Sequence, residues 1–179
     1  LEENNLVGSF PTELTKFSSL RVLDLGKNKV SGTIPESIGD LAALEDLQLQ
    51  STAMRGTLPS SLFNLPKLET LLLSDSDIGG NLPDNIGNAS SLRNLFLLSN
   101  PFTGTIPTGI SELASLEQVI IAFNRGLTGS VPTFEKNVAL TICVIGDLSL
   151  TGSIPPSLGN LPNLQIFSVA NNQLTGTVP

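Results

Sequence analysis

Three aspartates are the side chains best placed to do chemistry. Asp75 and Asp77 flank the end of a predicted strand, and Asp147 lies at the position equivalent to Asp75 further along the chain. Two carboxylates suggest a metal site, but no neighbouring oxygen ligands follow at a recognised spacing. There is no histidine, no phosphate-cradling loop and no nucleophile beside a base. We therefore predict no catalytic site, no metal site and no cofactor, and hence no enzyme.

Two further residues could be modified. Cys143 is the only cysteine and stands where equivalent positions carry Leu, Val or Phe, so it is interpreted as a small buried hydrophobe rather than a reactive thiol. A single cysteine cannot form an internal disulfide. Asn88 begins Asn88-Ala89-Ser90, the only N-glycosylation sequon, and we predict that a glycan would sit on the outer side of the chain if the protein is secreted.

A 24-residue repeat must position all of these side chains. The skeleton LxxLxLxxNxLxGxIPxxLxxL recurs through residues 1–179 as eight units, of which the first and last are partial, and its thirteenth and sixteenth positions are always Gly and Pro. Full units begin at Leu20, Leu44, Leu68, Leu92, Leu116 and Leu140, and the last unit begins at Leu164. This period predicts one solenoid domain, in which each unit buries its leucines only against its neighbours.

Within each unit, positions 3 to 7 alternate in polarity at period two, which predicts a strand with positions 4 and 6 facing inward. Stacked strands would form a parallel sheet. Position 9 is commonly Asn, whose amide can satisfy buried backbone groups of adjacent coils; Leu148 cannot, so this ladder should weaken in unit 140–163. The Ile-Pro corner predicts a short 3₁₀ or single-turn helix on the outer side.

Unit 116–139 departs from the pattern. It has one extra residue in Asn124-Arg125-Gly126-Leu127, and its helical segment, TFEKNVA, is one residue shorter. We expect a bulged loop with Arg125 at its tip, which is either a tolerated insertion or a contact site.

The repeated motif resembles the plant-type leucine-rich repeat, most fully in residues 20–43, 92–115 and 140–163. This type occurs in ectodomains of receptor-like kinases and receptor-like proteins and in polygalacturonase-inhibiting proteins. The resemblance implies an α/β fold: a right-handed solenoid with a concave parallel sheet, a second short strand near GxIP, and an extracellular or cell-surface location. Complete members carry paired-cysteine caps that this chain lacks, so we expect an excerpt of a longer chain with further repeats or caps at both ends.

The outward positions of the predicted concave sheet change character along the chain. The first coils are polar and acidic, whereas later coils carry a stripe of large apolar side chains at position 5, broadened by neighbours, with aspartates at its rim. The stripe and its neighbours are Leu72, Phe96, Leu98, Ile120, Phe123, Ile142, Val144 and Ile166, and the rim is Asp75, Asp147 and Asn171. Such a patch predicts a protein- or peptide-binding site with Phe96 and Phe123 as anchors. The alternative is that these residues merely favour strands.

Hydroxyl side chains flank the repeated Gly at positions 12 and 14. Pairs such as Thr103 and Thr105 recur at regular spacing. They would either order water, as an ice-binding surface does, or simply act as strand formers in the second sheet.

The net charge of the chain limits the classes of molecule that it is expected to bind. The net charge of −7 and the pI near 4.4 argue against nucleic acid and anionic membrane surfaces. The longest apolar run, Val119 to Phe123, is far shorter than the ~20 residues that span a bilayer, so membrane contact would come only through segments outside this chain. We therefore predict a non-catalytic extracellular recognition module, with a structural or adhesive solenoid of a wall, matrix or filament as the competing hypothesis.

Overall fold

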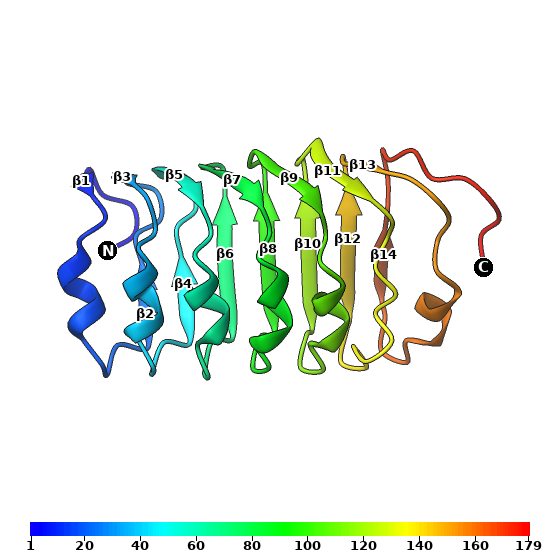
Figure 1. Cartoon of the computed structure of the whole chain (residues 1–179), viewed down its shortest axis with the longest axis horizontal. Coiled ribbons are helices and arrows are strands. Elements are labelled where there is room, and N and C mark those ends of the chain that lie inside the picture. The colour runs from blue at the N-terminus through cyan, green and yellow to red at the C-terminus, as the bar shows by residue number, and fades with distance from the viewer.

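Seven parallel strands lie side by side along one face of the computed structural model, which describes all 179 residues (Figure 1). We call this face the inner sheet. Its strands are β2 (Val22–Asp24), β4 (Asp46–Gln48), β6 (Thr70–Ser74), β8 (Asn94–Leu98), β10 (Gln118–Ala122), β12 (Ile142–Gly146) and β14 (Ile166–Ser168). Pairs such as Leu47 with Leu71 and Ile121 with Ile145 are in register, so the strand pairing repeats the sequence period and the predicted solenoid is confirmed.

The segments around the repeated glycines form a second parallel sheet of seven short strands, which we call the edge sheet. Its strands are β1 (Val7–Ser9), β3 (Lys29–Gly32), β5 (Ala53–Thr57), β7 (Asp77–Asn81), β9 (Phe102–Thr105), β11 (Gly126–Gly129) and β13 (Ser149–Leu150). The repeated glycine has φ between 73° and 110° in every unit. A Cβ atom would strain this left-handed backbone, which explains why only Gly occurs there.

Six 3₁₀ helices cover the side opposite the inner sheet, in the foreground of Figure 1. They are η1 (Thr12–Lys16), η2 (Glu36–Asp40), η3 (Ser60–Asn64), η4 (Asp84–Asn88), η5 (Thr108–Glu112) and η6 (Pro156–Asn160). Each follows the repeated Pro, which is extended, and only about eight residues separate that Pro from the start of the next unit, which leaves no room for a longer helix. None of these helices combines the length and the apolar character needed to span a membrane.

Unit 116–139 has no helix, which corrects the expectation of a shortened one at TFEKNVA. With one residue fewer after Pro132, the chain takes a tighter path, and Phe134 adopts a left-handed backbone (φ 54°) that turns its ring into the core. Asn137 is fully buried where other units place Leu, Ala or Phe. In the same unit, Arg125 is exposed at the bulged loop, as expected.

The core is one continuous column of 42 buried residues rather than a central ball. Positions 4 and 6 of the strands face into it as predicted, except in the last strand, where Phe167 remains 37% exposed because no further coil packs on its outer side. Cys143 is buried in this column, and its burial raises the pKa of the thiol to about 12. The thiol is therefore protonated at neutral pH, which fits a packing role.

Position 9 forms the predicted amide ladder. Asn124 is representative: its Nδ2 donates to Leu97 O and Ala122 O, both at 2.8 Å, and its Oδ1 accepts from Asn100 N at 3.2 Å. Leu148 makes no such bond, and the following strand β13 is only two residues long. The amides therefore join coils that the leucines alone would leave with unpaired backbone groups.

Replacing Asn124 with Ala should lower the free energy of unfolding by about 3 kcal/mol, because Leu97 O and Asn100 N each lose a hydrogen bond and Ala122 O keeps only the one from Ser99 N. Urea denaturation followed by circular dichroism measures this. The matched control is Asn4→Ala, since Asn4 is exposed and bonds only to nearby Leu1 and Glu2. Equal effects of the two substitutions would contradict the ladder.

Candidate functional site

The apolar stripe lies on adjacent strands of the inner sheet. Leu72 pairs with Phe96, Phe96 with Ile120, and Ile120 with Val144, so the four side chains stand in one row across β6, β8, β10 and β12. All four are half-buried, as cross-strand neighbours on an uncovered sheet face should be. The row therefore exists as a continuous surface, although packing along the sheet already accounts for part of its burial.

The remaining apolar residues widen this row on both sides. Ile142 pairs with Ile166, which is 51% exposed, and Leu98 pairs with Ala122. Phe123 follows directly and is 57% exposed, the most open aromatic side chain of the stripe. With Ile166 on β14, the apolar surface extends across five neighbouring coils.

Phe123 stands in an unfavourable backbone conformation. Its φ is 57°, in the left-handed region that bulky side chains avoid. The same position is left-handed in every coil and, except in the last coil, is held by a ladder bond to the next coil, here Phe123 N to Gly146 O at 3.2 Å. Other coils place Glu3, Lys27, Ser51, Asp75, Ser99, Asp147 and Asn171 there. The backbone turn is therefore a requirement of the fold, whereas an exposed aromatic ring on it is not.

The structure brings together only part of the predicted polar rim. Asn171 Nδ2 donates to Asp147 Oδ1 at 2.9 Å, so these two residues form one polar group beside the stripe. Asp75 is exposed three coils away, beyond the other side of Leu98 and Phe123. The aspartates therefore bracket the stripe and do not form a joint site. No three acidic, histidine or cysteine side chains are grouped as a metal ion would need.

In the first coils of the inner sheet, the outward-facing side chains are polar and form hydrogen bonds. Gln48 Nε2 donates to Asp46 Oδ2 at 2.8 Å, and Asp24 Oδ1 accepts from Gly26 N at 2.9 Å. Just before these strands, Arg21 makes a two-bond ion pair with Glu45 at 2.6 and 2.8 Å, and this hydrogen bonding lowers the pKa of the Glu45 carboxyl. The apolar stripe thus has a polar, acidic boundary at its N-terminal end.

The hydroxyl row separates into two kinds of side chain. Those at position 12 donate to the carbonyl of the preceding coil's glycine: Ser31 to Gly8 and Thr128 to Gly104, both at 3.1 Å. Those at position 14, such as Thr57 and Thr105, are exposed. The hydroxyls at position 12 therefore stabilise the edge sheet. The hydroxyl row is not continuous, because some units carry other residue types at position 12.

Asn88, in the predicted glycosylation sequon, ends η4 on the outer side, as expected from sequence. The residue is exposed, and its Nδ2 donates to Asn64 Oδ1 of the preceding coil at 3.0 Å. A glycan on this nitrogen would point away from the inner sheet.

Sequence reasoning missed two features. The left-handed backbone at position 8 was not anticipated, although the frequent Asp, Asn and Ser there are a signal for it. A cavity also lies on the outer side between η5 and the irregular segment 130–136. The missing residue in TFEKNVA was the only hint of it.

Comparison with known proteins agrees with this geometry. A family model described as a leucine-rich repeat region matches residues 4–177. Among solved structures, a plant peptide hormone receptor, RGFR1 in complex with RGF2, matches at a TM-score of 0.95 with 36% identity, covering 99% of this chain and 28% of the receptor chain. The Arabidopsis receptor kinase HAESA, in complex with the peptide hormone IDA and the co-receptor SERK1, matches at 0.95 with 31% identity, covering 100% and 30%.

A plant ice-binding protein also matches, at a TM-score of 0.68 with 23% identity, covering 100% of this chain and 73% of that one; this likeness concerns the fold alone. No curated protein matches the sequence. The chain spans less than a third of the two receptor chains, so it corresponds to one section of such a solenoid.

Replacing Phe123 with Asn should raise the free energy of unfolding by about 0.5–1 kcal/mol, because Asn tolerates the left-handed backbone and little buried area is lost. The same change at half-buried Phe96, on a regular strand, should lower it by roughly 1–2 kcal/mol. Thermal and urea unfolding of both variants tests this. A loss above about 1 kcal/mol for Phe123→Asn would mean that the ring serves packing.

Proposed function

The chain belongs to the leucine-rich repeat family, and we propose that it is a non-catalytic recognition module that binds a peptide or protein segment along the inner, concave sheet. The observation that carries this proposal is the apolar stripe with Phe123 exposed on a left-handed backbone. The fold requires neither the exposure nor the ring, and this supports a binding role for Phe123.

The stripe suits an extended segment. Leu72, Phe96, Ile120 and Val144 come from successive strands ~4.8 Å apart, so a partner lying across the strands would meet one apolar side chain at each step. Because the solenoid holds these side chains in place through its core, little ordering free energy is lost on this side when a partner binds. Rigid presentation is thus the proposed mechanism.

The acidic residues beside the stripe favour some peptide partners over others. The net charge is −7, and Asp75 and the Asp147–Asn171 pair lie along one edge of the stripe, near its two ends. We expect a segment with apolar side chains in its centre and basic groups toward its ends, attracted at low ionic strength. A nucleic acid would be repelled by this surface.

The similar structures support this class of function. RGFR1 and HAESA are each described in complex with a peptide hormone, and HAESA also with a co-receptor. Their identity to this chain is 36% and 31% over essentially all of it. By this likeness we propose an extracellular or cell-surface location, a peptide ligand, and flanking repeats or caps outside residues 1–179.

Replacing both Phe96 and Phe123 with Asp should abolish binding of peptides selected from a random display library on the wild-type chain, because two anchors become charged. Biolayer interferometry should show at least a hundredfold weaker affinity. Val22→Asp is the matched control, since Val22 is 55% exposed on β2 of the same sheet but outside the stripe.

Two results would refute this binding site: undiminished affinity in the double variant, or a library from which the wild-type chain enriches nothing. If the wild-type chain instead self-associates through the stripe, with Phe96→Asp and Phe123→Asp together giving monomers, the structural or adhesive solenoid takes its place.

Secretion from a eukaryotic host should give a chain that carries an N-glycan at Asn88, because the sequon is exposed on the outer side. Mass spectrometry before and after enzymatic deglycosylation should show one glycan, and Asn88→Gln should remove it. The glycosylated chain should keep its peptide affinity, since η4 lies opposite the inner sheet; a large loss would place the binding surface elsewhere.

A further inference from the structure

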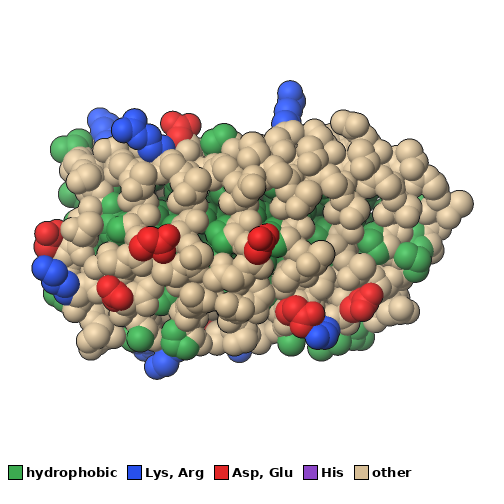
Figure 2. Space-filling view, in the orientation of Figure 1, with side chains coloured by type: hydrophobic (Ala, Val, Ile, Leu, Met, Phe, Trp, Pro, Cys, Tyr) green, Lys and Arg blue, Asp and Glu red, His purple; other side chains and the backbone are tan.

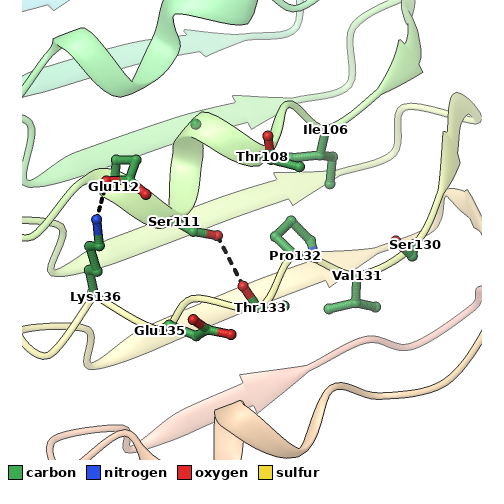
Figure 3. Close-up of a pocket in the computed structure, with 11 residues that line it drawn as sticks. Ile106, Thr108, Ser111, Glu112, Ser130, Val131, Pro132, Thr133, Glu135 and Lys136 are labelled. Atoms are coloured by element: carbon green, nitrogen blue, oxygen red, sulfur yellow. Dashed lines mark hydrogen bonds and ion pairs between the residues drawn. The ribbon is translucent and has the colours of Figure 1, made fainter.

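The outer side carries a polar cavity of about 340 Å³ that has no part in the function proposed above. It lies between η5 and segment 130–136, on the side opposite the inner sheet, and Figure 3 shows the side chains that line it. A volume of this order lies within the range of small-molecule sites in proteins, about 300–1,000 Å³.

The cavity exists because one helix is missing. Helices η2 to η5 follow one another in successive coils, but the coil after η5 has an irregular segment instead, so η5 has no helical neighbour on its C-terminal side. The shortened TFEKNVA segment turns Phe134 into the core and leaves the space above it open. No other coil of this chain offers the same hollow.

The walls of the cavity are fixed to each other. Asn137 Nδ2 donates to Ile110 O at 3.1 Å and to Leu113 O at 2.7 Å, and Phe134 N donates to Ser111 Oγ at 3.3 Å. Lys136 Nζ pairs with Glu112 Oε2 at 2.5 Å across the two walls (Figure 3). The loop therefore has a defined position relative to η5, as a preformed site requires.

The lining is mainly hydrogen-bonding. Four hydroxyl side chains line the space, namely Thr108, Ser111, Ser130 and Thr133, and Ser111 Oγ lies 3.5 Å from Thr133 Oγ1 (Figure 3). Hydroxyls both donate and accept, and carboxylates accept. Ile106 and Val131, which are buried, supply an apolar portion of the wall. A ligand that offers many hydroxyls and some C–H surface would match both parts.

The charges point to a neutral ligand. Lys136 is paired with Glu112, so the two opposite charges offset each other, although both side chains are more than half exposed, and Glu135 is a carboxylate without an ion pair. That carboxylate would repel an anionic sugar and can accept hydrogen bonds from sugar hydroxyls. Figure 2 shows this outer face, where acidic and basic side chains are scattered among uncharged ones.

We propose that this cavity is a second binding site, for a neutral carbohydrate, formed by η5 and segment 130–136. A sugar there would contact the hydroxyls and Glu135 through its own hydroxyls and rest a C–H face against Ile106 and Val131. The site is independent of the stripe, so either ligand can bind without the other.

Saturation-transfer NMR and calorimetry with cellobiose, maltose, lactose, sucrose and trehalose test the proposal on the 179-residue chain. At least one should bind with a dissociation constant on the order of 1–10 mM, unchanged between low and high salt. Digalacturonate should bind at least tenfold more weakly than that disaccharide, and spermidine should not compete with it.

Thr133→Trp, which fills the exposed mouth of the cavity, should weaken binding of that disaccharide at least tenfold. Ser60→Trp is the matched control, because Ser60 holds the equivalent position in a coil that has its helix and no cavity. Should Thr133→Trp fold poorly, Glu135→Ala gives the same test, with at least a fivefold loss expected.

The proposal is overturned if none of the five disaccharides binds, if the affinity is the same in Thr133→Trp and Glu135→Ala as in the wild type, or if only digalacturonate or spermidine binds. Peptide binding on the inner sheet should be the same in Thr133→Trp as in the wild type, so failure of one site does not imply failure of the other.

Discussion

Burial of leucines between successive coils is the interaction on which the whole structure depends. No coil is large enough to bury its own apolar side chains, so each is stable only against its neighbours, and the core becomes one column of 42 residues. In-register pairs such as Leu47 with Leu71 then fix every strand relative to the next. The asparagine ladder supports this packing by satisfying backbone groups at the strand ends, as Asn124 does.

The same packing leaves the outer surface of the inner sheet free to vary. Positions 4 and 6 fill the core, whereas position 5 contacts only cross-strand neighbours, so residues such as Phe96 and Ile120 are not required for the coil to form. Position 8 is a stronger case, because its left-handed backbone favours small polar residues and Phe123 departs from that preference. Surface chemistry and fold are therefore largely separable in this chain.

Unit 116–139 differs from the other units at two places, one with an inserted residue and one with a missing residue. Its extra residue near Arg125 is offset by the residue missing after Pro132, so Leu140 returns to register and Ile121 still pairs with Ile145. The coil therefore remains part of the column while its path changes on two sides. It exposes Phe123 at the inner sheet and, by losing a helix, opens the polar cavity on the outer side.

The sequence by itself determined the repeat, the inner strand of each unit, the inward leucines and the row that carries Leu72 and Phe96, because a 24-residue period with fixed Gly and Pro allows few other arrangements. The second strand of each unit is expected only from the resemblance of the motif to plant-type leucine-rich repeats. Only the tertiary structure decided that TFEKNVA forms no helix, that Phe134 turns inward, that position 8 is left-handed, and that η5 and segment 130–136 enclose a cavity. These features arise from contacts between neighbouring coils, and the pattern within one repeat does not encode them.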